Sequence, residues 1–389
     1  MPSPHEPACV TPFAPSVEGA GEETVPGACA PCLRRTRLLE LLAPHVERAR
    51  HERRLGQLLA LGEEELLDAV AGKRRQLVLH ELETSVDPAE ARAQAAGSGL
   101  AMMCRHCDAY PERLLEMADA PAVLHVNGDP ASLLREGVPT VAIVGARRAT
   151  PYGLEVARAL GRGLAAAGLP VVSGMALGID GAAHAGALEL GGPTIAVLAG
   201  GADIAYPSSK AALHRRIVAT PGCCVVSEMP PTFRPFKWGF PARNRIIAGL
   251  ADATIVVEAA ERSGSLITAE MAQDLGRPVG AVPGAVTNPM ALGTNALLRD
   301  GAELVRDAQD ILDTLLGPGV RCLQAGPDPA RLAPPLRALL DRLGVQPTTS
   351  AGLLIPGEEP DSVVAGLVEL ELLGYARRTP GGAYVRAAA

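Results

Sequence analysis

From residue 141 to residue 300 the sequence repeats a short apolar run followed by a stretch with helical spacing. The apolar runs do not alternate with polar residues, which is typical of strands buried on both faces of a parallel sheet. The helical stretches between them supply the crossovers that parallel strands require. We therefore predict an α/β fold whose core is a Rossmann-like, doubly wound parallel sheet over residues 123–316. The predicted pairs of strand and helix are 141–144 with 152–167, 171–173 with 179–190, 194–198 with 208–219, 224–227 with 241–250, 253–258 with 265–275, and 278–282 with 295–300.

Smaller segments flank this predicted core. Residues 1–34 begin with a Pro-, Glu- and Ala-rich stretch and are expected to form a disordered tail. Residues 35–122 are rich in leucines at spacings of three and four, which predicts a helical N-terminal module of the SAM or helix-hairpin-helix kind. Residues 317–334 are rich in Pro and Gly and predict a linker. Residues 335–389 are expected to form the last domain.

This C-terminal segment contains helical stretches followed by two short strands that a Pro-Gly-Gly turn joins, which is the order of a winged helix. Its third helix, the one that would read DNA, carries Glu369 and Glu371 and few basic residues. The sequence therefore leaves open whether the module contacts duplex DNA, contacts a protein, or is vestigial. A transcription regulator is disfavoured by the acidity of the same helix.

The 389 residues carry a formal net charge of −7, which argues against a histone-like protein. Any contact with nucleic acid must then be a local basic patch. The N-terminus lacks the basic-then-apolar pattern of a secretory signal, and no uncharged apolar run is long enough to span a bilayer. We therefore expect a cytoplasmic protein that does not associate with a membrane.

One stretch, Phe233 to Arg245, combines aromatic and basic residues. It holds three of the four phenylalanines, the single tryptophan Trp238 and four cations, and it contains no acidic residue. Rings that stack on bases, alternating with cations that follow the phosphates, are typical of a site for single-stranded nucleic acid. The alternative is a loop whose rings anchor it to the core and whose arginines are only solvated. Composition alone does not decide between the two.

The predicted turns at the carboxyl ends of the strands are rich in Gly and small polar residues. In a doubly wound sheet these turns meet at one edge, where helix N-termini offer free N–H groups to anions. The pattern predicts an anion-binding groove, although glycines in such turns also have steric reasons. The residues concerned are Gly145 to Arg147, Ser173 and Gly174 with Gly178, Gly200 and Gly201, Ser263 to Ser265, and Gly293 to Asn295.

The fingerprints of common cofactors are absent. No G-x-x-x-x-G-K-[ST] motif occurs, which disfavours a phosphate-loop NTPase. The only looser dinucleotide pattern, Gly161 to Ala166, lies inside a predicted helix. The second strand ends in Ser173, where a nicotinamide-dependent fold would offer an acid to the ribose. We therefore expect no cofactor.

Candidates for catalysis are weak. Asp180 and His184 share one face of a predicted helix, but such a pair is more often a structural hydrogen bond. Glu270 is placed near the groove, where a carboxylate could cleave a glycosidic bond or simply complement the helix dipole. Without a second acid we favour the structural interpretation.

The cysteines include two C-x-x-C pairs, Cys29 with Cys32 and Cys104 with Cys107. Four thiolates can form a tetrahedral zinc site, but the pairs are too far apart in sequence for a compact zinc ribbon or finger. The other interpretation is a set of unrelated reduced thiols beside helix ends. The sequence leaves the metal question open, and we assign no metal.

Taken together, the motifs resemble those of the DNA-processing protein A (DprA, or Smf) family from about residue 35 to the end. The matching motifs are Val144-Gly-Ala-Arg147, Thr150-Pro-Tyr-Gly153, Ser173-Gly-Met-Ala-Leu-Gly-Ile-Asp180 with Ala183-His184, Tyr206-Pro207, Ser227-Glu228, Phe240-Pro-Ala-Arg-Asn-Arg245, Glu258-Ala259, Ser263-Gly-Ser265, Val282-Pro-Gly284 and Gly293-Thr-Asn295. The resemblance implies a non-enzymatic, homodimeric protein that binds single-stranded DNA and loads the RecA recombinase onto it during natural transformation and recombination.

Carried over by position, Arg147 would bind phosphate, Lys210 would be the groove lysine, and Arg243 and Arg245 would form a basic wall. Ala146 stands where the family usually has serine, which removes one hydroxyl but keeps the arginine. The C-x-x-C at Cys104 is a second departure, because a single cysteine or none is expected there. The full set expected to bind single-stranded DNA is Gly145, Arg147, Ser173, Gly174, Lys210, Lys237, Phe240, Arg243, Asn244, Arg245, Ser263, Gly264 and Ser265.

The alternative is an enzyme. The core also resembles, more distantly, the family that removes phosphoribose from nucleoside monophosphates, with 263–270 as a degraded form of its Gly-rich catalytic segment. The Pro-Gly-Gly run that precedes this segment in that family is missing here. Release of free base from nucleoside monophosphates, abolished by Glu270→Gln, would favour the enzyme.

Overall fold

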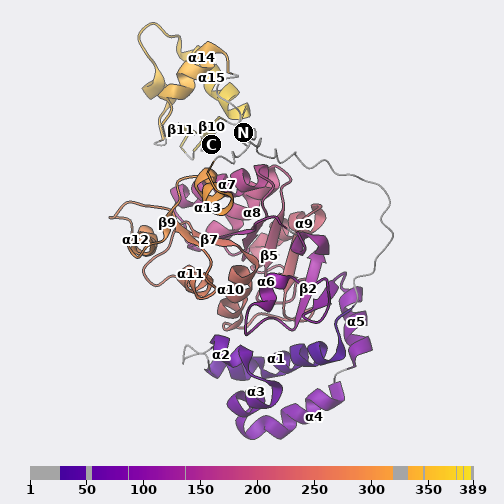
Figure 1. Cartoon of the computed structure of the whole chain (residues 1–389). Helices are drawn as coiled ribbons and strands as arrows, with labels where there is room; N and C mark the ends of the chain where they lie inside the picture. Colours follow the sequence, from indigo (N-terminus) through magenta and orange to yellow (C-terminus); the bar gives the residue numbers. More distant parts are fainter. Residues whose placement is uncertain are drawn as a thin grey trace, which may run out of the picture.

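The structure is a computed structural model, and it describes residues 27–49, 55–85, 87–135, 137–318, 332–344, 347–373, 375–379 and 381–386. Its centre is a nine-stranded sheet with the strand order β1-β2-β6-β5-β4-β3-β7-β8-β9 (Figure 1). The strands are β1 Ala101–Cys104, β2 Val123–Gly128, β3 Val141–Val144, β4 Val171–Ser173, β5 Thr194–Val197, β6 Cys224–Ser227, β7 Ala253–Val256, β8 Val279–Ala281 and β9 Glu303–Leu304.

The sheet is mostly parallel. Strands β3 to β9 pair with one another in parallel, whereas β2 pairs antiparallel with both β6 and β1. The prediction of a wholly parallel sheet is therefore wrong at this edge. It missed β1, which lies within the segment assigned to the helical module. The sequence of β1, Ala-Met-Met-Cys, lacks the β-branched and aromatic residues that identify strands.

Helices cover both faces of the sheet. Helices α7, α8, α9 and α13 bury their apolar sides against one face, and α6, α10 and α11 against the other. This is the two-sided burial that the non-alternating apolar runs predicted. The helices are α6 Glu112–Leu115, α7 Pro151–Ala166, α8 Ile179–Glu189, α9 Ala211–Ala219, α10 Gly239–Leu250, α11 Gly264–Asp274, α12 Leu292–Arg299 and α13 Ala308–Leu316.

The strand order reverses between β3 and β7, because β4, β5 and β6 follow on one side and β8 and β9 on the other. Ligands of open α/β sheets bind beyond the carboxyl ends of the strands near such a reversal. Here the first turn at that edge is fixed by Thr150, whose side chain caps α7 by accepting from the N–H of Gly153 at 3.2 Å. Glu258, which follows β7, accepts from the N–H and hydroxyl of Thr150 at 2.8 and 2.6 Å. The turns after β3 and β7 are therefore tied together.

The N-terminal module consists of helices, of which α1 packs on α3 and α4. Residues 30–34, predicted to be disordered, form the first turn of α1, while residues 1–26 of the predicted tail lie outside the described residues. The SAM or helix-hairpin-helix interpretation stays a prediction. The helices are α1 Ala30–Ala49, α2 Leu55–Ala60, α3 Glu63–Val70, α4 Arg75–Ser85 and α5 Pro88–Gly97.

The C-terminal module has its own small apolar core. Its elements are α14 Pro334–Arg342, the 3₁₀ helix η7 Ser350–Leu353, α15 Pro360–Leu372, and the antiparallel strands β10 Ala376–Arg378 and β11 Tyr384–Arg386. This order agrees with the elements expected from the sequence, although the middle helix is only a 3₁₀ segment. Most of the predicted linker, residues 319–331, lies outside the described residues. The winged-helix interpretation stays a prediction.

Among the helices in the described parts of the chain, none is both long and apolar enough to cross a membrane.

Candidate nucleic-acid interface

Two cations lie at the N-terminus of α8. Arg147 is exposed in the turn after β3. This turn packs on the residue before α8, since a Cβ added to Gly178 would lie 2.2 Å from the carbonyl oxygen of Ala146. A Cβ added to Gly181, in the first turn of α8, would lie 2.5 Å from the Nζ of Lys210. The turn of Arg147 and the ammonium of Lys210 therefore lie at a helix end where the helix dipole contributes partial positive charge.

An aromatic pair adjoins these cations. The guanidinium carbon of Arg147 lies 5.1 Å from the ring centroid of Phe240, within the range of a cation–π contact. The same ring lies 5.4 Å from the ring centroid of Tyr206, at an interplanar angle of 45°. Tyr206 is exposed, and Phe240 is half-buried. A cation, an exposed ring and a half-buried ring thus stand side by side at the carboxyl edge of the sheet.

Helix α10 extends this arrangement toward α11. Phe240 and Asn244 are spaced i, i+4, so they share one face of α10. The side-chain amide of Asn244 donates to the carbonyl of Gly264 at 3.4 Å. Gly264 is exposed and follows Ser263, the N-cap of α11. We call the whole patch the Arg147 surface, and its members are Arg147, Tyr206, Lys210, Phe240, Asn244, Ser263 and Gly264.

Arg243 does not belong to this surface, and the prediction that it forms an exposed basic wall is wrong. Its side chain is buried and donates hydrogen bonds to the carbonyls of Gly174 and Val197, while its Nη2 lies 3.9 Å from the carboxylate of Asp180. Burial lowers the pKa of Arg243 to about 10, and the charge of Asp180 opposes that shift. Arg243 therefore joins the ends of β4 and β5 from inside the fold.

Arg245 is also buried, with 4% of its surface exposed, so its assignment to the basic wall is wrong as well. Its Nη2 lies 2.5 Å from the carboxylate of Glu228, which is itself buried, and its Nε lies 3.4 Å from that of Asp119. Two carboxylates neutralise this guanidinium. A phosphate would have to displace these carboxylates to pair with it.

Several small residues of the predicted site have structural roles. The hydroxyl of Ser173 is fully buried and donates to the carbonyl of Ile143 at 2.6 Å. Gly174 is buried, and a Cβ there would lie 2.2 Å from the guanidinium carbon of Arg243. Ser265 is buried and shares a 2.7 Å hydrogen bond with Ser263. The expectation that Ser173, Gly174 and Ser265 offer groups to a ligand is therefore not supported.

Gly145 is half-buried, and its lack of a side chain serves packing. A Cβ at this position would lie 2.6 Å from the side chain of Ile179 and 2.9 Å from the carbonyl of Glu258. The absent side chain thus lets the turn after β3 approach both α8 and the end of β7. At this position the glycine is therefore explained by close packing and not by contact with an anion.

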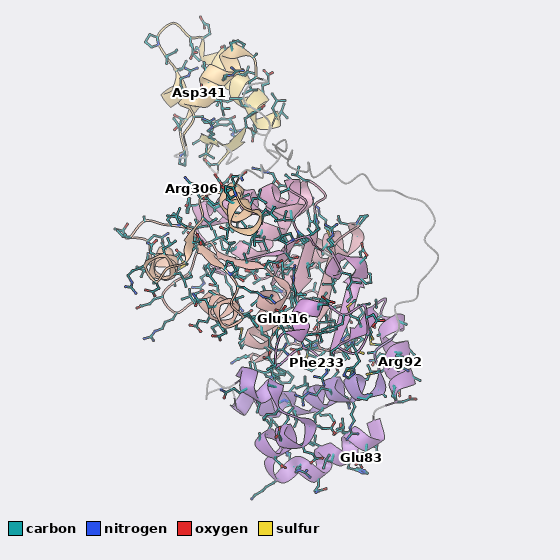
Figure 2. All side chains as sticks on the ribbon, in the orientation of Figure 1. Glu83, Arg92, Glu116, Phe233, Arg306 and Asp341 are labelled. Atoms are coloured by element: carbon teal, nitrogen blue, oxygen red, sulfur yellow. The ribbon has the colours of Figure 1, made fainter. Side chains whose placement is uncertain are left out.

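The aromatic residues of the stretch from Phe233 to Arg245 divide between two roles. Trp238 is 1% exposed, and its Nε1 donates to the carbonyl of Ala43 in α1 at 3.0 Å. Phe233 and Phe236 pack against the same apolar cluster, and Figure 2 shows Phe233 between the N-terminal module and the sheet. These three rings anchor the loop, as the alternative interpretation held. Only Phe240 joins the Arg147 surface. Lys237 is exposed just before α10.

The candidate catalytic groups do not form a catalytic pair. Asp180 is buried and accepts from the N–H groups of Gly174 and Ala176 at 3.2 and 3.4 Å. His184 pairs instead with the hydroxyl of Thr194 at 2.7 Å, and burial lowers its pKa to about 3. Both residues therefore have structural contacts, but with other partners, and the expected hydrogen bond between Asp180 and His184 is replaced by these. Glu270 is exposed on α11.

Tyr206 is a member of the surface that the sequence does not identify. The Tyr206-Pro207 pair is a family motif, but the motif indicates no role for the ring. The signal available was the lysine four residues later, Lys210, since both residues belong to the connection between β5 and α9. Proximity to Phe240 was not visible in the sequence, because α10 lies one crossover further along the chain.

Comparisons with known proteins agree with this architecture. Residues 101–316 match the sequence model of a family described as DNA recombination-mediator protein A. The match begins at β1 and ends with α13, so it covers the nine-stranded sheet and its helices.

Relatives extend the similarity. Protein Smf of Escherichia coli (strain K12) is 38% identical over 285 residues, which cover 71% of this chain and 75% of that protein. A putative DNA processing protein DprA of Mycobacterium tuberculosis (strain H37Rv) is 47% identical over 221 residues, which cover 57% of this chain but only 54% of that protein. The X-ray structure of DNA processing protein A from Streptococcus pneumoniae superposes with a TM-score of 0.58 at 36% identity, covering 72% of this chain and 95% of the other.

Proposed function

Because this chain belongs to the DNA recombination-mediator protein A family, we propose that it binds single-stranded DNA through the Arg147 surface and acts as a recombination mediator. The observation that carries the proposal is the exposed arginine stacked on Phe240 beside Tyr206, at the same sheet edge as Lys210. Each of these groups matches a different part of an unpaired strand.

The cations match the phosphates. Arg147 and Lys210 flank the N-terminus of α8, where the helix dipole adds to their charge. The rings match the bases, since every base has a face that can stack on an aromatic ring and such stacking tolerates any sequence. A duplex, whose bases are already stacked on one another, could use only the cations. We therefore expect a preference for single strands and little dependence on base sequence.

The test is a comparison of two double variants of equal charge. Arg147→Ala with Lys210→Ala is expected to weaken binding to an unpaired oligonucleotide strongly and to reduce the slope of log affinity against log salt by about 0.7 for each lost phosphate contact. Lys73→Ala with Arg74→Ala removes an arginine and a lysine that are exposed on the N-terminal module, and it should bind as the wild type does. Titration by fluorescence anisotropy over a range of salt concentrations measures both quantities. Equal affinities of the two variants would remove the Arg147 surface from consideration.

We further propose that the protein is a homodimer that loads RecA onto the bound strand, as in natural transformation. The description of the family as a recombination mediator supports this step, because a mediator hands a strand to a recombinase. The expected result is that the full chain restores the ATPase activity of RecA on a strand coated with single-strand-binding protein. A chain that binds the strand but leaves RecA inactive would contradict the loading step and not the binding.

For the C-terminal module we propose a winged helix that contacts protein and not duplex DNA. The exposed side chains of α15 include Val364, Val368 and Leu372, which follow one another at i, i+4 and i+8, together with the acidic Glu369 and Glu371. An apolar and acidic face offers no counter-charge to phosphates. Deleting the module from residue 332 onward is therefore expected to leave strand affinity unchanged.

A further inference from the structure

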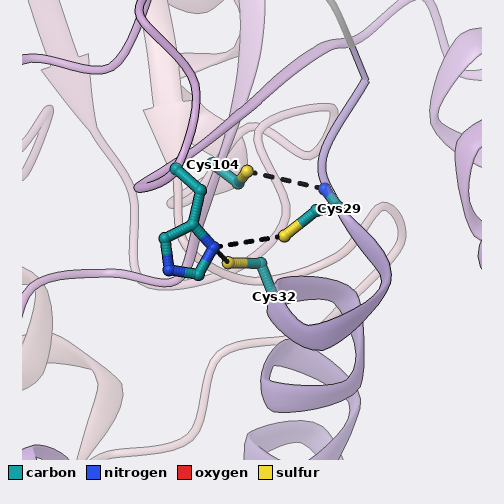
Figure 3. Close-up of side chains that lie close together, drawn as sticks. Cys29, Cys32 and Cys104 are labelled. Carbon is teal, nitrogen blue, oxygen red and sulfur yellow. Dashed lines mark hydrogen bonds between the residues drawn. The ribbon is translucent and has the colours of Figure 1, made fainter.

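Four side chains from distant parts of the sequence converge where α1 begins and β1 ends. They are Cys29, Cys32, Cys104 and His106, and one potential ligand atom of each lies within 4.8 Å of the others. Figure 3 shows the three cysteines approaching one another from two backbone segments. None of them belongs to the Arg147 surface.

The spacing of the ligand atoms fits a tetrahedral ion. The Nδ1 of His106 lies 3.3 Å from the Sγ of Cys29 and 3.4 Å from that of Cys32. Zinc–sulfur and zinc–nitrogen bonds of ordinary length place neighbouring ligands of a tetrahedron roughly 3.5 to 3.8 Å apart. The two separations between the imidazole nitrogen and the sulfurs are therefore within a few tenths of an ångström of those in a filled site, and all four ligand atoms lie within 4.8 Å of one another.

The surroundings also suit thiolate ligands. The backbone N–H of Cys29 points at the Sγ of Cys104 at 3.5 Å, which is the kind of outer contact that holds a metal-bound sulfur in place. Cys32 and Cys104 are buried in an apolar cluster with Leu33 and Val123, which keeps water from them. His106 lies on the exposed side and leaves a route of entry.

We propose that Cys29, Cys32, Cys104 and His106 bind one zinc ion as a structural site. Three thiolates and one imidazole are a ligand set that favours zinc over the hard cations magnesium and calcium. Four protein ligands close the coordination sphere, so the ion has no open position for a substrate. The objection from sequence, that too many residues separate the two cysteine pairs, no longer holds because the fold brings them together.

The structure also differs from the set of four cysteines that the sequence left open as zinc ligands. His106 takes the place of Cys107 among the converging atoms. The Sγ of Cys107 lies 3.2 Å from that of Cys104, at the margin of the cluster. A variant of Cys107 is therefore a matched control, since it removes a neighbouring thiol without removing a ligand.

The site would cross-link two parts of the fold. It joins the start of α1, in the N-terminal module, to the end of β1, at the antiparallel edge of the sheet. A zinc ion bound by all four residues would cross-link the chain across more than seventy residues. Cross-links that close long loops lower the conformational entropy of the unfolded chain the most, and metal binding then contributes to folding.

The first experiment measures the metal content of the full-length chain by plasma mass spectrometry after purification without chelators. About one zinc per chain is expected, in line with a closed structural site. Cys32→Ser and His106→Ala are expected to lose the metal, whereas Cys107→Ser is expected to keep it. A wild-type chain without stoichiometric zinc, or with these cysteines in disulfides, would overturn the proposal.

A second measurement keeps the test independent of variants that fail to fold. Cobalt exchanged into the wild-type chain should show the absorption of a tetrahedral ion with thiolate charge-transfer bands. X-ray absorption at the zinc edge should show three sulfur neighbours and one nitrogen. A spectrum with four sulfur neighbours would overturn the assignment of His106, and an octahedral cobalt spectrum would overturn the site.

Discussion

Arg147 and Arg245 are both arginines of segments that the sequence marked as basic, but they differ in what surrounds them. Arg147 stands in a turn with a ring beneath it and solvent above it. Arg245 lies inside the fold between two carboxylates. The first can exchange water for a phosphate at little cost, whereas the second would have to break a buried ion pair.

This difference predicts that Arg245 acts on stability and Arg147 on binding. Arg245→Ala leaves Glu228 buried without its partner, so the free energy of unfolding is expected to fall by about 3–5 kcal/mol. Urea denaturation measures this loss. The control is Arg299→Ala, because Arg299 pairs with Asp300 at the surface with 78% of its side chain exposed, and such a change should stay within about 0.5 kcal/mol. A stable Arg245→Ala protein that no longer binds DNA would contradict the assignment.

At the scale of elements, the crossing of α7 and α8 depends on two glycines. A Cβ on Gly161 would lie 2.2 Å from the carbonyl oxygen of Ala183, and one on Gly186 would lie 2.0 Å from that of Arg158. The two backbones therefore approach more closely than any other residue type permits. The glycine pattern that superficially matched a dinucleotide fingerprint in α7 serves this contact, because Gly161 faces the neighbouring helix and not a ligand.

Gly161→Ala is accordingly expected to lower the free energy of unfolding by about 1–3 kcal/mol, since backbone atoms of α8 must move to admit the methyl group. The matched control is Gly97→Ala in the last turn of α5, where a Cβ meets no atom within 4 Å. That change should be neutral or should stabilise the protein by up to about 1 kcal/mol, because alanine loses less entropy on folding. Thermal denaturation of both variants compares them. Equal free energies of unfolding for Gly161→Ala and Gly97→Ala would contradict the close contact between α7 and α8.

At the scale of the whole molecule, Trp238 joins the N-terminal module to the sheet. It is the single tryptophan of the sequence, and its ring is buried among residues of α1, α3 and α4. The same connection would be reinforced at its other end by the cysteine and histidine cluster. The module is thus docked on the sheet through an apolar cluster.

Intrinsic fluorescence tests this docking directly. The emission of Trp238 is expected to be that of a buried indole and to stay unchanged when a saturating unpaired oligonucleotide is added, because its ring has no face open for stacking. Unfolding in urea serves as the control and should shift the emission to the red. The free energy of unfolding of Trp238→Ala should be lower than that of the wild type by about 3–5 kcal/mol, as for other buried aromatic residues. Quenching by the oligonucleotide would instead support the stacking role that the sequence suggested.

The sequence by itself determined the alternation of strands and helices in the core. Buried parallel strands and the helices between them leave local signals, namely apolar runs without alternation and caps such as Thr150, and each signal lies within a few residues. The predicted strands from 141 to 282 therefore agree with β3 to β8 to within two residues at either end. Motifs likewise pointed to the family before any fold was known.

Only the tertiary structure decided which basic and aromatic residues remain available to a ligand. Arg243, Arg245 and Trp238 looked equivalent to Arg147 and Phe240 because composition does not record which carbonyl, carboxylate or helix will lie against a side chain. Those partners come from elements that are distant in sequence, and they come into contact only when the helices pack on the sheet. The convergence of the cysteines with His106 has the same origin. Burial and pairing are properties of the packed chain, so no local pattern could have assigned them.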